Sequence, residues 1–257
     1  MVTLKRWHSA QKYERSFWQN LAISIESGAV SQLNWYQWKA SRLERLLARF
    51  AAAYPTDKGR LLEIGSGPIG IVGSLQAGEH FAVDPLEDFY RQSSTLTTVR
   101  RPGVVYLKGT GEDLPFANKF FSLVIVDNVI DHTYSPKKIL QEVHRVLAAD
   151  GLLYLAVNIH TRWGAAIHIL LARLCIDRGH PYSFTASSIQ ELLFRNKFEI
   201  LGEELEDYEQ SRKTDCNSPS TKDKLKGCTG LSEFLYHTIC RKISDDTFKA
   251  PRRSARS

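Results

Sequence analysis

Short apolar runs recur along most of this chain, and stretches with helical spacing of apolar residues separate them. Runs of this length are typical of β-strands in globular proteins. The seven runs that predict strands are residues 61–64, 80–84, 104–108, 122–127, 152–158, 198–205 and 233–241. Strands that alternate with helices usually pair in parallel, with helices covering the sheet. The pattern therefore predicts an α/β fold with helices on both faces of the sheet.

The clearest helical pattern runs from Ser135 or Pro136 to Ala149. Ser135 is a favourable N-cap, Pro136 suits the first turn of a helix, and Gly151 follows just past the expected end. Apolar residues recur on one side of this segment at Ile139, Leu140, Val143, Val146 and Leu147. This helix is expected to pack one face on the sheet.

The N-terminal region carries a helical pattern without strands. Apolar and aromatic residues recur at helical spacing over residues 8–54, and a break around Gly28 and Ser31 divides the region into two helices. Pro55 and Gly59 close it before the first strand. The aromatic cluster of Trp35, Tyr36 and Trp38 is expected either to pack in the core or to cover a bound ligand as a flap.

The rest of the chain divides by composition. The predicted parts are an N-terminal helical extension or cap (1–55), a main domain (56–243) with an apolar, partly helical insertion (159–186), and a disordered basic tail (244–257). A helix is predicted over residues 187–196. Residues 208–230 are polar and predict a long loop, which in a compact domain is either functional or disordered.

The net charge of +6 is concentrated at the two ends of the chain. Residues 1–50 hold 8 Lys and Arg against 3 Asp and Glu, and residues 241–257 hold 6 against 2, so the part between them is net negative. A basic end can bind nucleic acid or an anionic membrane surface, or it can be a solvated helix face and tail. The negative body does not favour a nucleic-acid duplex across its cleft.

Cysteine spacing and hydropathy predict a cytoplasmic location. The four cysteines form no C-x-x-C pair, so neither a zinc site nor a disulfide framework is indicated. The N-terminus lacks the apolar core of a secretory signal. The longest apolar stretch, residues 163–175, is interrupted by His168 and Arg173 and is too short to cross a bilayer.

Candidate chemistry begins in the segment LLEIGSGPIG, residues 61–70. A predicted strand runs into a glycine-rich turn with the spacing G-x-G-x-x-G, which comprises Gly65, Ser66, Gly67 and Gly70. Glycines permit a tight turn and let backbone N–H groups approach a ligand closely. The segment predicts a nucleotide-type ligand, although a glycine-rich turn can also be only a turn.

An acidic residue stands at the distance that such a ligand requires. Asp84 ends the second predicted strand, 19 residues after Gly65, and Pro85 follows it. A carboxylate there can accept hydrogen bonds from two ribose hydroxyls. The alternative role for Asp84 is to cap a turn or helix.

Four segments give the chain a resemblance to a known family. They are GTGEDLPF (109–116), FFSLVIVDNVIDH (120–132), ILQEVHRVLAADGLLYLAV (139–157) and SFTASSIQELLFRNKFEI (183–200). In order and spacing they resemble class I S-adenosylmethionine-dependent methyltransferases, specifically the small-molecule, type 11-like group. The resemblance implies a Rossmann-like, seven-stranded, mostly parallel sheet. It also implies methyl transfer from S-adenosylmethionine to a small-molecule or glycan- or lipid-type acceptor, with residues 159–186 on the substrate side.

The resemblance also implies roles for individual residues. Glu63, Gly65 and Gly67 match the loop that holds the methionine part of the cofactor. Asp84 matches the ribose-binding acid, Glu112 and Asp113 match the segment beside the adenine, and Asp127 and Asn128 match the turn that flanks the cofactor. Thr110 stands where the family often has Asp. The expected cofactor-binding residues are Glu63, Gly65, Ser66, Gly67, Gly70, Asp84, Pro85, Glu112, Asp113, Asp127 and Asn128.

The expected catalytic chemistry is modest. The cofactor supplies the leaving group, so the protein mainly positions the acceptor and excludes water, and no metal ion is expected. His132, after the fourth predicted strand, is the best candidate for a general base, and a structural role in the turn is the alternative. His160 and Tyr182 are weaker candidates.

Two other readings of the motifs stay open. The glycine loop and Asp84 also fit a nicotinamide- or flavin-binding Rossmann protein, which the LPF segment and the long N-terminal extension disfavour. A methyltransferase-like chain could instead act as a non-catalytic binding or interaction protein.

The apolar residues Trp163, Ile167, Leu170 and Leu171 could wall a substrate pocket or pack on the core.

Overall fold

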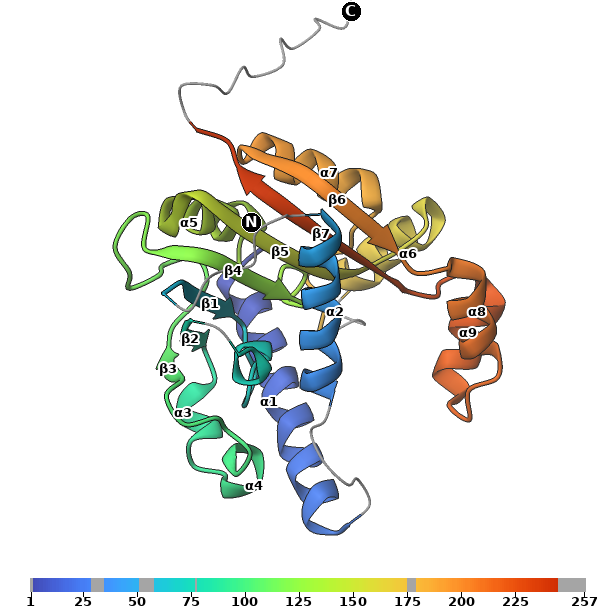
Figure 1. The fold of residues 1–257 in the computed structure, drawn as a ribbon. Helices are drawn as coiled ribbons and strands as arrows, with labels where there is room; N and C mark the ends of the chain where they lie inside the picture. The colour runs from blue at the N-terminus through green and yellow to red at the C-terminus, as the bar shows by residue number, and fades with distance from the viewer. Residues whose placement is uncertain (1, 29–34, 51–57, 77, 175–178, 245–257) are drawn as a thin grey trace, which may run out of the picture.

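The structure is a computed structural model and describes residues 2–28, 35–50, 58–76, 78–174 and 179–244. In these residues a seven-stranded sheet runs through the molecule in the order β3-β2-β1-β4-β5-β7-β6 (Figure 1). The strands are β1 (Arg60–Ile64), β2 (Glu79–Asp84), β3 (Val105–Lys108), β4 (Phe121–Asp127), β5 (Leu147–Ile159), β6 (Phe198–Leu205) and β7 (Phe234–Lys242). The first five strands pair in parallel, and β7 is antiparallel to both of its neighbours. The predicted mostly parallel, Rossmann-like sheet is confirmed.

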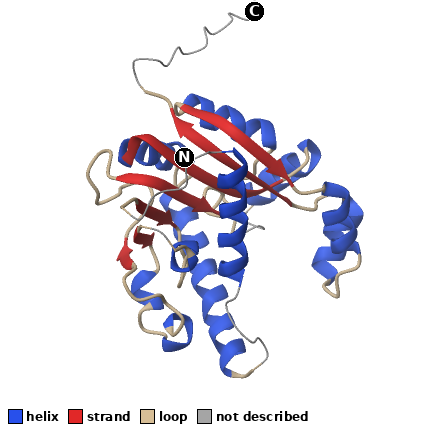
Figure 2. Ribbon diagram, viewed as in Figure 1, coloured by secondary structure: helices blue, strands red, loops and turns tan. Residues whose placement is uncertain are grey.

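Helices cover both faces of this sheet (Figure 2). Because successive side chains of a strand point to opposite faces, Leu61 and Leu62 of β1 enter two different cores. One core is shared with α1 (Leu4–Glu26), α2 (Trp35–Phe50), the 3-10 helix η1 (Ile71–Ser74), α3 (Glu87–Tyr90) and α4 (Ser94–Thr97). The other core is shared with α5 (Pro136–Val146) and α7 (Ala186–Arg195).

Buried charges attach α2 to the end of β4. The Asp127 carboxylate, 1% exposed, accepts hydrogen bonds from Lys39 and, at 2.8 Å, from the Arg42 guanidinium. Arg42 also donates to the Tyr154 hydroxyl at 3.1 Å. The predicted two helices of the N-terminal region are therefore present, and the second is held to the sheet. The predicted junction at 55/56 lies outside the described residues.

The helix after β4 is shorter than predicted. α5 begins at Pro136, with Ser135 as its N-cap, but ends at Val146 and not at Ala149. Leu147 is fully buried and pairs with Phe121 of β4, so the backbone enters β5 where the apolar pattern alone would continue the helix. Gly151 accordingly lies inside the strand and not at a helix end.

The prediction of a long loop over residues 208–230 is wrong. This segment forms two helices, α8 (Tyr208–Cys216) and α9 (Thr221–Thr229). Asp207 and Ser220 cap their first turns through their side chains. The pair packs closely, because a Cβ on Gly227 would lie 2.6 Å from the Cys216 sulfur. The tail from residue 245 onward lies outside the described part of the chain.

Candidate functional site

A cleft opens at the carboxyl ends of β1, β2 and β4, where open parallel sheets bind their ligands. Five of the predicted cofactor-binding residues line it, namely Gly65, Asp84, Pro85, Glu112 and Asn128. His132 also lines the cleft. The other six, Glu63, Ser66, Gly67, Gly70, Asp113 and Asp127, are not among the lining residues.

The glycine loop between β1 and η1 adopts backbone conformations that favour glycine. Gly65, Gly67 and Gly70 have φ values of 67°, 60° and 81°. A Cβ on Gly65 would overlap the Val129 side chain, and one on Gly67 would lie 2.6 Å from the Tyr36 hydroxyl oxygen. The loop therefore packs against both the turn after β4 and the helix α2.

Asp84 holds this loop in place from the end of β2. One of its carboxylate oxygens accepts a hydrogen bond from the Gly67 N–H at 2.9 Å, and the other accepts one from the Leu86 N–H at 2.8 Å. Burial raises the pKa of Asp84 to about 7, although the two backbone N–H groups oppose that shift. Asp84 thus both orders the loop and faces the cleft.

Glu63 lies behind the loop and acts on its far side. Its carboxylate accepts a hydrogen bond from the Val72 N–H at 3.0 Å, at the start of η1. Burial raises the pKa of Glu63 to about 8, against an ordinary value of 4.5. Glu63 therefore supports the shape of the loop from behind the lining residues.

Replacing Glu63 with glutamine is expected to flatten the pH dependence of stability. As the pH rises from the ordinary pKa toward about 8, the unfolded chain loses the proton that the folded protein retains. Stability from this group is therefore complete below its ordinary pKa and is lost as the pH rises through the folded pKa. Thermal unfolding between about pH 5 and about pH 9 should show a shallower fall in Tm for Glu63→Gln than for the parent.

The matched control is Glu79→Gln, at the exposed start of β2. This variant should keep the parental slope of Tm against pH. A parental slope in Glu63→Gln as well would contradict the protonation of Glu63 in the folded protein.

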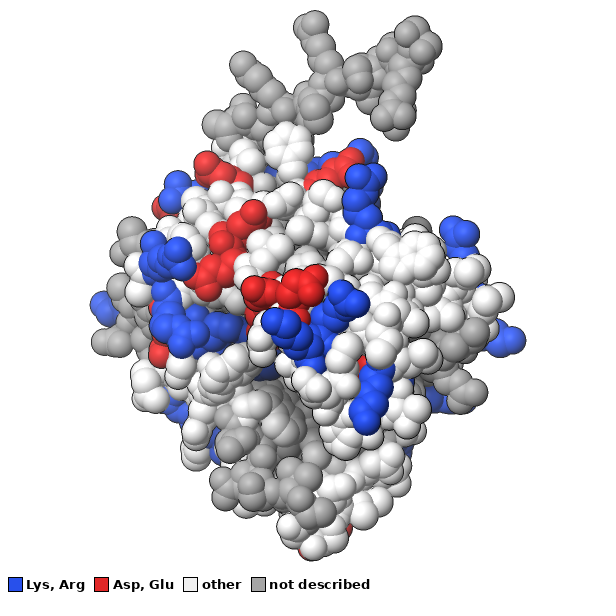
Figure 3. Space-filling view, turned by 90° about the vertical axis from the view of Figure 1, so that its right-hand side faces the viewer, with Lys and Arg blue, Asp and Glu red and all other residues white. Residues whose placement is uncertain are grey.

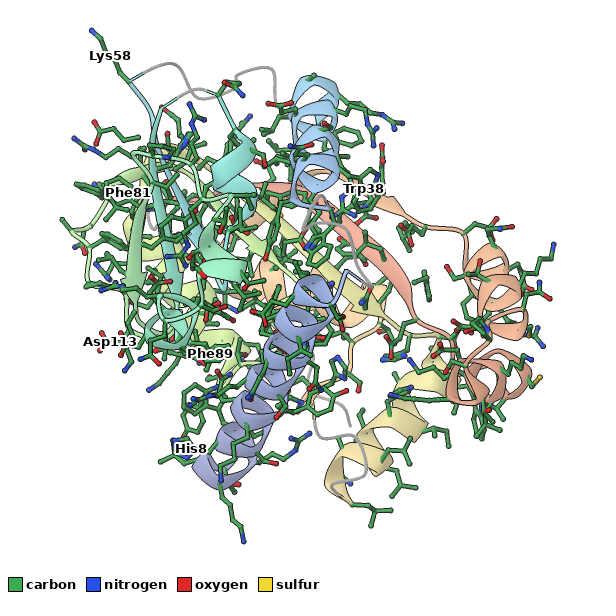
Figure 4. The ribbon with its side chains drawn as sticks, turned by 90° about the horizontal axis from the view of Figure 1, so that it is seen from below. His8, Trp38, Lys58, Phe81, Phe89 and Asp113 are labelled. Carbon is green, nitrogen blue, oxygen red and sulfur yellow. The ribbon has the colours of Figure 1, made fainter. Side chains whose placement is uncertain are left out.

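The segment after β3 places Glu112 at the cleft and Asp113 outside it. One oxygen of Glu112 accepts hydrogen bonds from the Tyr134 and Ser135 N–H groups, at 2.8 and 3.0 Å. Asp113 is exposed and lies at the periphery of the molecule in Figure 4. Thr110 lines the cleft together with Glu112. Of the two acidic residues in this segment, Glu112 is therefore the one that a ligand in the cleft can contact.

The turn after β4 separates the roles of Asp127 and Asn128. Asp127 is occupied by the cations of α2, whereas Asn128 lines the cleft with a φ of 54°. The buried side-chain oxygen of Asn128 has no hydrogen-bond partner in the structure. A buried polar atom without a partner, at a cleft wall, is the kind of group that a bound ligand would satisfy.

His132 is held at the far end of the same turn. Its Nδ1 lies 3.0 Å from the Gly179 carbonyl oxygen and its Nε2 lies 3.6 Å from a carboxylate oxygen of Asp131. Its ring is 4.6 Å, centroid to centroid, from the ring of His180. His132 therefore lies between the cleft and the polar side chains of Asp131 and His180.

The N-terminal helix α1 forms the outer wall of the cleft. Trp7, Gln11 and Glu14 of α1 line the cleft opposite the strand ends. Figure 4, in which His8 marks the start of α1, shows this helix lying across the lower side of the molecule. The cleft volume is about 80 Å³, whereas pockets for ligands of this size usually measure about 300–1,000 Å³. The side chains of α1 therefore leave little free space at the strand ends.

The aromatic cluster of α2 does not form this wall. Tyr36 is buried and donates a hydrogen bond to the Ser66 carbonyl at 3.2 Å, so it supports the glycine loop. Trp38 is exposed, with the Arg42 guanidinium 4.7 Å from its ring centroid. Figure 4 shows Trp38 away from His8 and α1.

The insertion contributes α6 (Arg162–Arg173), whose apolar residues do not all face the core. Trp163 and Leu170 are more than half exposed, and the Trp163 indole N–H donates to the Thr229 carbonyl of α9. Tyr182 donates a hydrogen bond to the Tyr134 carbonyl at 3.0 Å and accepts one from the Val2 N–H. Tyr182 thus links the insertion to both the start of α5 and the N-terminus.

Metal-ligand side chains gather in two places within the described residues. One group is Asp131, His132 and His180, and the other is His160, His168 and Glu233. The residues of each group are distant in the sequence, by up to 49 positions in the first group and up to 73 in the second, so only the fold brings them together. No spacing motif marks either group.

The surface charges do not form a single basic face over the part of the molecule in view. On the side drawn in Figure 3, Lys and Arg lie interspersed with Asp and Glu. Within the described residues, no helix has the length and apolar character needed to cross a membrane.

Comparisons with known proteins agree with this geometry. Residues 62–155 match the family described as methyltransferase domain. The putative methyltransferase YrhH of Bacillus subtilis is 28% identical over 109 residues, which are 41% of this chain and 61% of that protein. The chain spans about half the length of the curated relatives it matches.

Solved structures share the fold. A putative methyltransferase from Bacillus halodurans superposes with a TM-score of 0.56 at 18% identity, covering 79% of this chain and all of that one. A putative sarcosine dimethylglycine methyltransferase from Galdieria sulphuraria gives 0.59 at 14% identity, covering 82% and 86%. The resemblance to class I S-adenosylmethionine-dependent methyltransferases is confirmed for the fold and for the domain at residues 62–155.

Proposed function

We propose that this chain, which carries a methyltransferase domain on the class I fold, transfers a methyl group from S-adenosylmethionine to a small-molecule acceptor. The observation that supports this most directly is the cleft at the strand ends, where the glycine loop, Asp84, Glu112 and Asn128 converge. When bound, the cofactor would supply the methyl group, and its sulfur would leave with the bonding electron pair as the neutral thioether of S-adenosylhomocysteine.

The residues of the cleft fit such a cofactor. Gly65 would let the loop backbone approach the methionine part, since no side chain intervenes there. The Asp84 carboxylate would accept from the ribose, and Glu112 and Thr110 would lie beside the adenine. The unpartnered oxygen of Asn128 provides one further acceptor on the cleft wall.

The polar end of the cleft is the proposed acceptor side. His132 lines the cleft and is oriented by the Gly179 carbonyl and by Asp131. An imidazole held in this way can take a proton from an acceptor hydroxyl or amine as the new bond forms. Trp7 and Gln11 of α1 would exclude water from the other side once the helix closes.

The mixed surface charge supports a small acceptor over a nucleic acid. Binding to a duplex requires a run of Lys and Arg that contacts successive phosphates. On the face in Figure 3, Lys and Arg lie among Asp and Glu, and Trp7, Gln11 and Glu14 of α1 line the outer side of the cleft. An acceptor that fits beneath a single helix is therefore favoured.

The cofactor is tested by calorimetric titration of the purified chain with S-adenosylhomocysteine, with NAD as a parallel control. We expect micromolar binding of S-adenosylhomocysteine and none of NAD. Asp84→Asn should weaken that binding by about 10- to 100-fold, because a charged hydrogen-bond acceptor contributes about 1.5–3 kcal/mol. Lys108→Gln is the control, since its exposed ion pair with Asp88 lies on the neighbouring strand end.

Binding of NAD alone would overturn the choice of cofactor. Binding of neither compound would sink the proposed enzyme and favour a methyltransferase-like interaction protein. If S-adenosylhomocysteine binds, radiolabelled methyl transfer to panels of small hydroxyl and amine compounds identifies the acceptor. His132→Gln should then lower kcat while leaving the affinity for S-adenosylhomocysteine within about threefold of the parent.

A further inference from the structure

Two histidines and a glutamate form a compact group at the end of β5. Each of His160, His168 and Glu233 offers one ligand atom, and these atoms lie within 4.8 Å of one another. The two imidazole rings are stacked, with centroids 4.0 Å apart and planes inclined by 26°. Both histidines are only 6% exposed. Buried imidazoles this close to a carboxylate are ligand types that transition metals prefer.

The fold builds this group from three separate elements. β5 and β7 are antiparallel, and Ile159 of β5 pairs with Phe234 of β7. His160 follows Ile159 and Glu233 precedes Phe234, so these two residues come together just beyond the last pair of the ladder. Thr161 then caps α6, and this helix carries His168 back to stack on His160. Gly164 makes this return possible, because a Cβ there would lie 3.2 Å from the Cβ of His160.

Unsatisfied polar atoms accompany the group. The Nδ1 atom of His160 is buried and has no hydrogen-bond partner, and the same holds for the hydroxyl oxygen of Ser232, next to Glu233. A buried polar atom of this kind destabilises the fold when nothing binds it. The unpartnered nitrogen of His160, within a cluster of ligand side chains, is a group that a bound ion would satisfy.

We propose that His160, His168 and Glu233 form a binding site for a divalent transition-metal ion of the zinc type. Three protein ligands of this kind leave a coordination position open, as in catalytic zinc sites. Binding of the ion does not depend on the proposed methyl transfer.

Lys226 would compete with the ion for the Glu233 carboxylate. Its ammonium nitrogen lies 3.2 Å from a carboxylate oxygen of Glu233, so the lysine neutralises the glutamate when no ion is present. A divalent ion must act against this positive charge. Removal of the Lys226 charge should therefore strengthen metal binding, an effect that a purely structural ion pair would not produce.

The test uses the full chain, freed of metals by dialysis against a chelator and titrated with Zn²⁺ in a calorimeter. Co²⁺ absorption provides a second readout of the ligand geometry. We expect one Zn²⁺ per chain at the site. His168→Gln and Glu233→Gln should each weaken binding by at least about 10-fold, since even indirect contacts to a metal ligand are worth about 10- to 100-fold. Lys226→Gln should tighten it by about threefold or more.

Two further variants localise the ion. His144→Gln changes a histidine that contacts the Ile243 carbonyl at the opposite end of the sheet, and it should leave Zn²⁺ binding unchanged. His180→Gln belongs to the second group of metal-ligand side chains. Loss of binding in His180→Gln but not in His168→Gln would move the ion to that group and overturn the proposal.

The outcome is independent of the cofactor. Circular dichroism checks that each variant is folded, and Lys226→Gln keeps the proposal falsifiable if a buried variant does not fold. Absence of Zn²⁺ and Co²⁺ binding in the parent and in Lys226→Gln would overturn the metal site while leaving S-adenosylhomocysteine binding intact. Loss of S-adenosylhomocysteine binding with retained Zn²⁺ binding would instead contradict the proposed function alone.

Discussion

Replacement of Gly65 with alanine is expected to weaken binding of S-adenosylhomocysteine by about 30-fold or more. The left-handed conformation at Gly65, with a φ of 67°, costs an L-residue about 1–2 kcal/mol. The new methyl group would also overlap Val129, so the loop must shift away from the turn after β4. Since both Gly65 and Val129 line the cleft, the shift changes its walls directly. Calorimetric titration measures the loss.

Gly103→Ala separates this effect from backbone strain alone. Gly103 has a φ of 90° in the turn before β3, and a Cβ there meets nothing within 4 Å. The variant therefore carries comparable strain away from the cleft and should bind S-adenosylhomocysteine as the parent does. Parental affinity in Gly65→Ala would mean that the loop does not contact the ligand.

Arg42→Met is expected to lower the free energy of unfolding by about 3 kcal/mol. Loss of one partner from a buried ion pair typically costs about 3–5 kcal/mol, because the remaining charge stays buried without its full compensation. The Arg42 side chain is 5% exposed and Asp127 is 1% exposed, while Lys39 still reaches Asp127 and moderates the loss. Urea unfolding followed by circular dichroism gives the difference.

Arg49→Met provides the comparison on the same helix. Arg49 pairs with Glu204, but its side chain is 64% exposed, so this pair is screened by water. Its removal should change the free energy of unfolding by less than about 1 kcal/mol. Equal losses in the two variants would contradict the assignment of Asp127 as a buried anchor for α2.

Local patterns were sufficient to predict the sheet. Each strand of the central β1, β2 and β4 is buried on both faces, which produces a short apolar run that a sequence reveals directly. The end of α5 could not be found in this way. Leu147 is apolar in either conformation, and its pairing with Phe121 depends on a strand 26 residues away.

The helical pair α8 and α9 was hidden by its polarity. Gly227 is the only residue of the pair that is buried among those described, so neither helix shows an apolar stripe. The signals that could have revealed them are the caps Asp207 and Ser220, each of which accepts a backbone hydrogen bond three residues on. Because no apolar face accompanied these caps, the polar composition of the segment favoured a loop.

The residues of the candidate site likewise fall into those that chain order predicts and those that depend on tertiary packing. Gly65 follows β1, Asp84 ends β2 and Glu112 lies four residues after β3, so their place at the cleft follows from chain order. Asp127 shares that order but turns to α2, because the positive charges of that helix compete for it. The placement of α1 and the pairing of His160 with His168 depend on tertiary packing, which leaves no trace in residue spacing.

The position of α1 has a consequence for the catalytic cycle. Because α1 lines the cleft opposite the strand ends, we expect this helix to move outward when the spent cofactor departs. In an enzyme of the proposed kind, each turnover would then include one outward and one inward movement of α1. Steady-state turnover would depend on solvent viscosity, whereas a single turnover on preloaded enzyme would not.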